Sequence, residues 1–217
     1  MNKTSALFLI LIAAMTMIAS YEALSPLPAK TVIIDVLGLS AFVFLCASLL
    51  IGPLATIWPK SFAQIIEPRR AVGIIAFVLS LAHALLAFAL VFGFDIGPFL
   101  TFLPLLVSLP AMLVLLILTI TSNDYSIKKL GPGEWKTIQR LNYVAFVLSF
   151  AHFLLKARGL FVFVNGKTFV DLAELLAVLA GIATVALQIA GFMVRKSKMN
   201  AAAPAQAPAT GEANQKE

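Results

Sequence analysis

The stretch RRAVGIIAFVLSLAHALLAFALVF, residues 69–92, consists of two arginines followed by 22 residues of which only a serine and a histidine are polar. About 20 apolar residues are enough for an α-helix to cross the ~30 Å hydrocarbon core of a bilayer. A helix is the plausible form there, since an open strand edge leaves backbone groups unsatisfied in lipid. The stretch therefore predicts a membrane-spanning helix with one histidine, His83, inside it.

The composition of the whole chain supports this interpretation. Hydrophobic residues make up 61% and charged residues 12% of the 217 residues, and the mean hydropathy is +0.99. Soluble domains average about 45–50% apolar and about 25% charged residues. We therefore expect an all-α integral membrane protein.

Six apolar segments of spanning length follow one another along the chain: Ala6–Leu24, Val32–Ile57, Ala71–Phe92, Pro98–Ile120, Trp135–Leu155 and Leu172–Val194. They predict a bundle of six transmembrane helices within residues 1–199. Three prolines in the fourth segment, Pro98, Pro104 and Pro110, predict a kink or an irregular start. The Ala/Pro-rich residues 200–217 predict a disordered tail.

The basic residues indicate how the bundle is oriented. Of the 16 lysines and arginines, 12 fall on one side of the six segments and four on the other. The side rich in Lys and Arg is expected in the cytoplasm, so both termini are predicted to be cytoplasmic and the protein to lie in the cell inner membrane. The first segment resembles a signal peptide, but Met17 or Ile18 would occupy the small-residue position of its cleavage site, so we expect a retained helix.

The two histidines of the chain, His83 and His152, lie in the third and fifth segments, which run in the same direction. His83 follows Arg70 by 13 residues and His152 follows Arg140 by 12, which at about 1.5 Å per residue places both imidazoles at nearly the same depth, in the outer half of the bilayer. Such a pair can supply two axial nitrogens to a haem iron. Hydrogen bonding across a helix interface and proton or ion handling remain open from spacing alone. Zinc is disfavoured because two histidines are too few ligands.

Several motifs together resemble a known family. They are the stretch from Arg69 to His83, the run Leu118-Thr-Ile-Thr-Ser-Asn, Lys128-Lys-Leu-Gly, Trp135-Lys-Thr-Ile-Gln-Arg-Leu-Asn-Tyr, and Ala151-His-Phe. In combination, over roughly Leu37–Arg158, the chain is similar to the ferric reductase-like transmembrane domain, and in particular to haem-binding membrane subunits of bacterial methionine sulfoxide reductase systems. The resemblance implies a six-helix b-type haem protein that transfers electrons, with the haem between the third and fifth helices and His83 and His152 as its axial ligands.

One position departs from the family pattern. Gln139 stands where the family has the first histidine of its fifth helix, which corresponds to a ligand of an inner haem. Haem iron is normally held by His, Met, Cys or Tyr rather than by a neutral amide. We therefore expect one haem b rather than two.

The remaining expectations concern partners. The sequence has no Gly-x-Gly-x-x-Gly nucleotide loop, so we expect a redox subunit that needs a separate redox protein or a membrane quinol, with quinone as a second candidate cofactor. Its other predicted partner is the lipid bilayer, and no nucleic acid is expected. Lys156 and Arg158, just beyond His152, are candidates to pair with haem propionates. The alternative is a haem-free membrane protein whose histidines serve helix packing, proton handling or partner binding.

Overall fold

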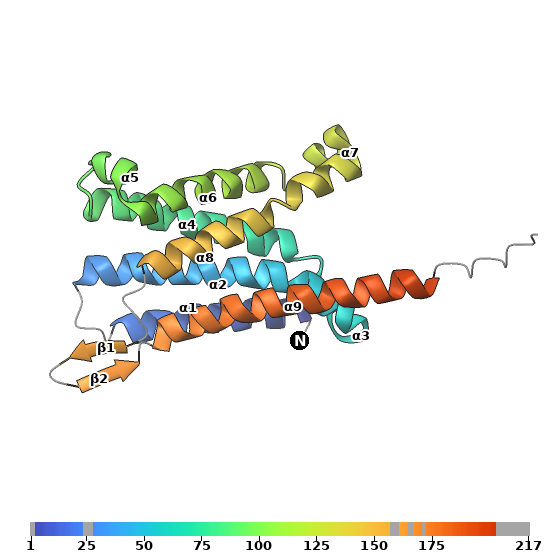
Figure 1. Cartoon of the computed structure of the whole chain (residues 1–217), viewed down its shortest axis with the longest axis horizontal. Helices are drawn as coiled ribbons and strands as arrows, with labels where there is room; N and C mark the ends of the chain where they lie inside the picture. Colours follow the sequence, from blue (N-terminus) through green and yellow to red (C-terminus); the bar gives the residue numbers. More distant parts are fainter. Residues whose placement is uncertain (1–2, 24–27, 157–160, 165–166, 171, 203–217) are drawn as a thin grey trace, which may run out of the picture.

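The computed structural model describes residues 3–23, 28–156, 161–164, 167–170 and 172–202 (Figure 1). Six helical segments in these ranges are long and apolar enough to cross a membrane. They are α1 (Lys3–Ala23), α2 (Ala29–Ile57), α4 (Arg69–Leu90), α6 (Leu103–Ile120), the consecutive helices α7 (Asp124–Gln139) and α8 (Asn142–Lys156), and α9 (Leu172–Ala202). The predicted six-helix, all-α membrane architecture is confirmed.

Short elements connect the long helices. A one-turn helix α3 (Pro59–Phe62) and a 3₁₀ turn η1 (Ala63–Ile65) follow α2, and α5 (Gly97–Thr101) precedes α6. Between α8 and α9 lies a small antiparallel hairpin of β1 (Phe161–Val164) and β2 (Lys167–Val170), with Phe161 opposite Val170. These elements lie at the two ends of the bundle and leave its middle to the long helices (Figure 1).

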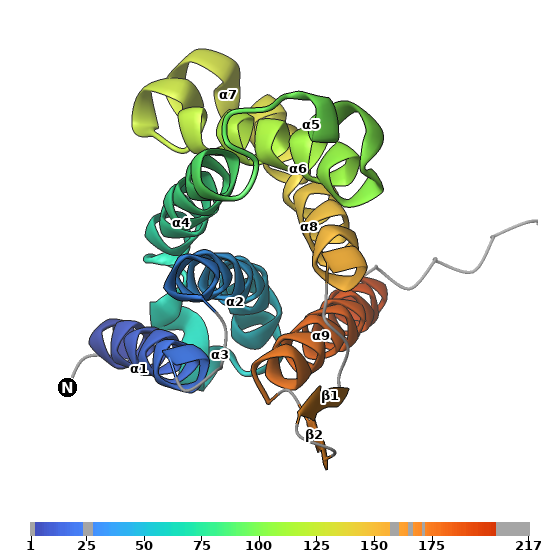
Figure 2. The same ribbon diagram turned by 90° about the vertical axis from the view of Figure 1, so that its left-hand side faces the viewer.

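Helix α2 is the centre of the bundle. It packs against α4 on one side and α9 on another, with α1 beside it, while α6 packs against α8 (Figure 2). Its middle is almost entirely buried, from Leu39 to Ile51, which agrees with its high content of apolar residues. The α2–α4 pair and the α6–α8 pair therefore face each other across the interior.

A stack of phenylalanines joins α2 to α8. The ring of Phe42 on α2 is stacked on Phe146, Phe150 and Phe153 of α8, with ring centroids 6.0, 5.5 and 5.6 Å apart. On the far side, a Cβ at Gly181 of α9 would come within 2.8 Å of Phe150. Because lipid is as apolar as these rings, close packing rather than exclusion of water holds the helices together here.

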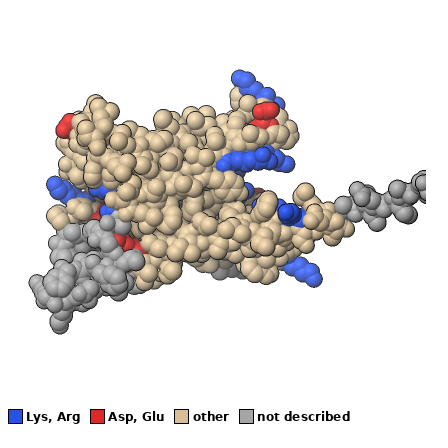
Figure 3. Space-filling view, in the orientation of Figure 1, with Lys and Arg blue, Asp and Glu red and all other residues tan. Residues whose placement is uncertain are grey.

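The basic residues gather at one end of the bundle. The space-filling view shows most Lys and Arg at the end that carries α3, α7 and the last turns of α9 (Figure 3). We call this the basic end. Lys3 belongs to it, since its Nζ donates to the Ser61 carbonyl oxygen at 2.7 Å. At the opposite end Lys30 donates to the Leu90 carbonyl oxygen at 3.4 Å.

The fourth and fifth segments differ from uninterrupted helices. At Phe102 the backbone is extended, between α5 and α6, so the irregular start expected from the prolines is confirmed. The predicted fifth helix, Trp135–Leu155, belongs to one of the six candidate spans but is not uninterrupted. α7 ends at Gln139, the chain turns through Arg140 and Leu141, and α8 begins at Asn142.

Tightened backbone hydrogen bonds define this turn. α7 is a polar helix with charged side chains along much of its length, and its own kink at Gly131 (φ 78°) lies before the turn. In the turn, hydrogen bonds tighten to three-residue spacing, from the Leu141 N–H to the Ile138 oxygen and from the Tyr143 N–H to the Arg140 oxygen. Gln139 is therefore the last residue of α7, and this turn separates it from α8, the helix that carries His152.

The sixth helix is longer than expected. α9 continues to Ala202, so residues 200–202, assigned to a tail by composition, are helical because the Ala-rich sequence favours helix. The rest of that predicted tail, residues 203–217, lies outside the described residues.

The phenylalanine stack generates a stability prediction. Replacing Phe42, which is 5% exposed, with alanine removes the ring that three others contact and is expected to cost about 3–5 kcal/mol. The thermal unfolding midpoint of the detergent-solubilised protein measures it. Phe192→Ala is the matched control, because that ring is 61% exposed on α9. Equal midpoints for the two variants would contradict the packing described here.

Candidate functional site

The two histidines meet in the interior of the bundle. His83 comes from α4 and His152 from α8, and their ring centroids are 6.3 Å apart with the ring planes at 77°. Both side chains are half-buried. The structure thus brings together two residues that lie 69 positions apart in the sequence, at the common depth that their spacing from the arginines predicts.

Each imidazole ring is hydrogen-bonded to a backbone carbonyl oxygen. Nδ1 of His83 lies 2.8 Å from the Ile34 oxygen of α2, and Nδ1 of His152 lies 2.8 Å from the Pro104 oxygen of α6. A carbonyl oxygen only accepts, so in each pair Nδ1 carries the proton and donates it. A neutral imidazole protonated at Nδ1 has its lone pair at Nε2. Both histidines are therefore held in the tautomer that can ligate a metal through Nε2.

The hydrogen bond of His83 depends on a glycine. A Cβ at Gly38 of α2 would lie 2.8 Å from Nδ1 and 2.9 Å from Cε1 of His83. Only a residue without a side chain lets the imidazole lie against the α2 backbone and reach the Ile34 oxygen, one turn earlier. Sequence reasoning missed Gly38 because a lone glycine in an apolar helix carries no signal of what packs on it.

The acceptor of the His152 hydrogen bond lies at the start of α6. The extended backbone at Phe102 begins a new helix, and Pro104 lies in its first turn. Proline is favoured there, since its missing N–H would be unpaired anyway. The sequence predicted the irregularity of this helix start. It did not predict that the Pro104 oxygen accepts the hydrogen bond of His152.

The pair has the dimensions of a two-imidazole metal site. Bonds from a metal to imidazole nitrogens are about 2 Å long. Two such bonds in line, with each nitrogen at the rim of its ring, separate the ring centroids by about 6 Å, and the observed separation is 6.3 Å. The tautomers and the separation both fit a metal centre with one imidazole on each side.

The candidate propionate partners lie beyond this pair. Lys156 is exposed at the end of α8, one turn past His152, and its Nζ lies 5.3 Å from the centre of the Phe102 ring, a cation–π contact. Arg158 lies outside the described residues. Lys156 therefore stands on the same helix as His152, toward the end opposite the basic end.

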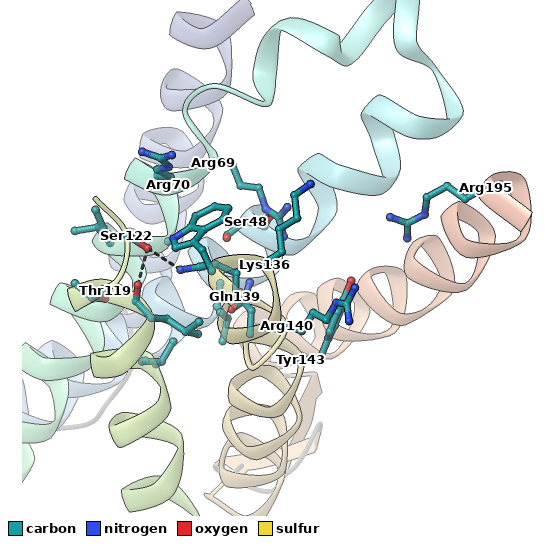
Figure 4. A pocket seen from close by; sticks show the side chains of 17 residues that line it. Ser48, Arg69, Arg70, Thr119, Ser122, Lys136, Gln139, Arg140, Tyr143 and Arg195 are labelled. Atoms are coloured by element: carbon teal, nitrogen blue, oxygen red, sulfur yellow. Dashed lines mark hydrogen bonds between the residues drawn. The ribbon is translucent and has the colours of Figure 1, made fainter. Parts of the chain in front are cut away.

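Gln139 lies at a different place. Its Nε2 donates to the Thr121 and Ser122 hydroxyl oxygens, at 3.3 and 3.4 Å, and it lines a cavity of about 420 Å³ at the basic end (Figure 4). Neither histidine lines this cavity. The structure does not bring Gln139 together with His83 and His152, so its position is separate from theirs.

The fold and the site together define a multi-pass α-helical membrane protein with an intramembrane histidine pair. Residues 37–150, more than half of the chain, match the family model described as ferric reductase like transmembrane component, and the chain belongs to this family. Both histidine-bearing helices overlap the matched region, although His152 itself lies two residues beyond its end.

Curated relatives agree with the family. The chain is 33% identical over 128 residues to the protein-methionine-sulfoxide reductase heme-binding subunit MsrQ of Agrobacterium fabrum, covering 57% of this chain and 58% of that protein. It is 30% identical over 127 residues to MsrQ of Brucella ovis, covering 57% and 56%. It is 32% identical over 152 residues to the magnetosome protein MamZ of Magnetospirillum gryphiswaldense, covering 66% and 22%.

These matches are partial. The chain spans a little over half the length of the MsrQ proteins and less than a quarter of MamZ. No solved structure matches the chain.

The contact at Gly38 generates a second prediction. Gly38→Ala places a methyl group against the His83 ring and is expected to break the hydrogen bond to Ile34, lowering the thermal midpoint of the purified protein. Gly52→Ala on the same helix is the control, since its Cβ would meet only Arg69, at an ordinary 3.7 Å. There no packed ring is displaced, and the helix propensity gained by alanine is offset by the Pro53 that follows, so only a small change of the midpoint is expected. A Gly38 variant as stable as the Gly52 variant would contradict the close contact.

Proposed function

We propose that this protein is a membrane-embedded b-type haem electron-transfer subunit, with one haem held between α4 and α8 by Nε2 of His83 and Nε2 of His152. The protein would pass electrons between a donor, either a membrane quinol or a soluble carrier, and a separate redox protein. The names of the MsrQ relatives, heme-binding subunits of a reductase, support both the cofactor and the need for a partner.

The observation that carries the proposal is the pair of protonated Nδ1 atoms. An imidazole inside a bilayer needs a hydrogen-bond partner, and each ring has one backbone oxygen 2.8 Å away. Metal-bound histidines typically donate their second nitrogen in this way, which orients the ring and raises the basicity of the ligating nitrogen. The acceptor of His83 is the Ile34 oxygen of α2, and the acceptor of His152 is the Pro104 oxygen of α6. Rotation of either ring would break its hydrogen bond.

A bound haem supplies a one-electron ferric–ferrous couple, whose potential depends on the axial ligands, hydrogen bonding and burial. The chain's own residues set these conditions. Neutral imidazoles would add no charge to the site, and the helices around the half-buried pair are apolar. Lys156 and Arg158, beyond His152, are the proposed partners of the propionates through charge-assisted hydrogen bonds.

We propose one haem per chain. Gln139 stands at the inner position, and its amide nitrogen is already engaged with the Thr121 and Ser122 hydroxyls. The described side chains around it include no histidine, since the two histidines of the chain lie elsewhere.

A second candidate function rests on the same hydrogen bonds. His83 joins α4 to α2 and His152 joins α8 to α6, so the two residues already serve as bridges between helices. A haem-free protein that uses them for packing or for proton handling is the alternative. It is disfavoured because interhelical bridging needs only one nitrogen of each ring and gives no reason for the two rings to meet.

The haem proposal predicts an absorption spectrum. The detergent-purified protein, expressed with ample haem and reduced with dithionite, is expected to show the α-band of a b-type haem, because two imidazoles give a six-coordinate iron. His83→Ala and His152→Ala are each expected to abolish that band or convert it to a five-coordinate spectrum. Gln139→Leu is the control and is expected to keep both the band and the haem content.

The haem content per chain tests the proposal that each chain binds one haem. One equivalent is expected from extraction and quantification of the haem against protein. Two equivalents would show the interpretation of Gln139 to be wrong, and a colourless wild-type protein would leave only the packing alternative.

The basic end predicts the orientation. We propose that this protein lies in the cell inner membrane with both termini in the cytoplasm, because Lys and Arg gather at the end that carries α3 and α7. Single cysteines introduced at Lys128 and at Asp95, in a Cys46→Ser background, are expected to react with a membrane-impermeant maleimide from opposite sides of the membrane. Labelling of both from the same side would contradict the topology.

A further inference from the structure

The cavity at the basic end has no role in the function proposed above. It measures about 420 Å³, within the range of about 300–1,000 Å³ that small-molecule sites occupy. Residues from α2, α4, α6, α7, α8 and α9 line it, so nearly the whole bundle contributes to its wall (Figure 4).

The lining carries charge of one sign. Five cations line the cavity and no Asp or Glu does: Arg69, Arg70, Lys136, Arg140 and Arg195. Arg70 pairs with Asp124 outside the lining, with Nη1 2.8 Å from Oδ1. In the part of the chain that the structure describes, no ion pair involves the other four. A cleft lined by one sign of charge concentrates ions of the opposite sign.

One of these cations is held in place by the fold. Arg69 is half-buried, and its Nε donates to the Ser48 carbonyl oxygen of α2 at 3.1 Å. Its two terminal nitrogens stay available while that bond fixes the direction of the side chain. A fixed guanidinium is suited to phosphate, which it can bind with two parallel hydrogen bonds.

The rest of the lining is apolar or interfacial. Leu45, Leu115 and Leu118 contribute apolar wall, and Trp135 and Tyr143 are the aromatic types found where lipid meets water. Trp135 is itself anchored, since its Nε1 donates to the Thr121 oxygen at 2.9 Å. Cations beside an apolar wall at a membrane boundary fit a ligand that is anionic at one end and apolar at the other.

We propose that this cavity binds an anionic phospholipid of the adjoining leaflet, with its phosphate at Arg69, Arg140 and Arg195 and its glycerol and first acyl carbons against the leucines. The shared chemistry is a phosphate ester, which a soluble molecule could also present. The apolar wall and the position at the membrane boundary favour the lipid. The proposal does not depend on haem at the histidine pair.

Native mass spectrometry of the full-length protein in detergent tests it without any variant. Dioleoyl phosphatidylglycerol is the probe, dioleoyl phosphatidylcholine the zwitterionic comparison, and glycerol 1-phosphate and inorganic phosphate the soluble arms. One phosphatidylglycerol is expected to bind more tightly than phosphatidylcholine by at least ten-fold, and the soluble anions are expected not to compete at millimolar concentration. Competition by either soluble anion at that concentration would assign the cavity to a soluble phosphate ester instead.

A pair of double variants locates the site. Arg140→Gln with Arg195→Gln removes two cations of the cavity and is expected to weaken phosphatidylglycerol binding by about thirty-fold. Lys128→Gln with Lys196→Gln removes the same charge from the same end, on α7 and α9, but from residues that do not line the cavity. This control pair is expected to bind as wild type does.

Three results would overturn the proposal: equal binding of the two lipids, equal loss in both double variants, or unchanged binding in the cavity variant. A second equivalent of haem that displaces phosphatidylglycerol would also overturn it and assign the cavity to haem. The haem spectrum of the histidine pair is expected to be the same in both double variants, so this test fails or succeeds separately from the proposed function.

Discussion

Water is absent from the middle of a bilayer, so every polar side chain placed there must find its hydrogen-bond partner inside the protein. His83 and His152 meet this constraint with backbone oxygens, at Ile34 and at Pro104. Two local features of the bundle are associated with these two hydrogen bonds. Gly38 is required for the approach of one ring, and the interrupted start of α6 presents the acceptor for the other.

The same two bonds determine what the pair can do. They put a proton on each Nδ1 and leave each Nε2 as a ligand. An imidazole that hydrogen-bonds only to bridge helices could use either nitrogen and has no need of a second histidine. The separation of 6.3 Å between the rings is the feature that favours a shared metal centre, and the MsrQ relatives are heme-binding subunits.

The histidine pair and the cavity at the basic end differ in chemistry. The half-buried histidine pair lies among apolar helices. The cavity at the basic end has four arginines, a lysine and Gln139 in its wall. Glutamine stands here at the position of a haem ligand in the family pattern, and we propose that this cavity binds a phosphate-bearing amphiphile. The haem that we propose lies instead at the histidine pair.

The sequence by itself determined the number of membrane-spanning helices, and it predicted a common depth for the two histidines. These properties depend on hydrophobic length and on residue spacing along a helix, which are local. It also indicated that prolines would disturb the start of α6. It did not reveal the turn at Arg140 and Leu141, because hydrogen bonds tightened to three-residue spacing end α7 there and no proline or glycine marks the position in the sequence. Only the tertiary structure decided that Gly38 lies against His83 and that five cations line one cavity. It also decided that His83 is hydrogen-bonded to the Ile34 oxygen and His152 to the Pro104 oxygen. Such contacts join residues tens of positions apart, and their geometry depends on how neighbouring helices pack, which no local pattern records.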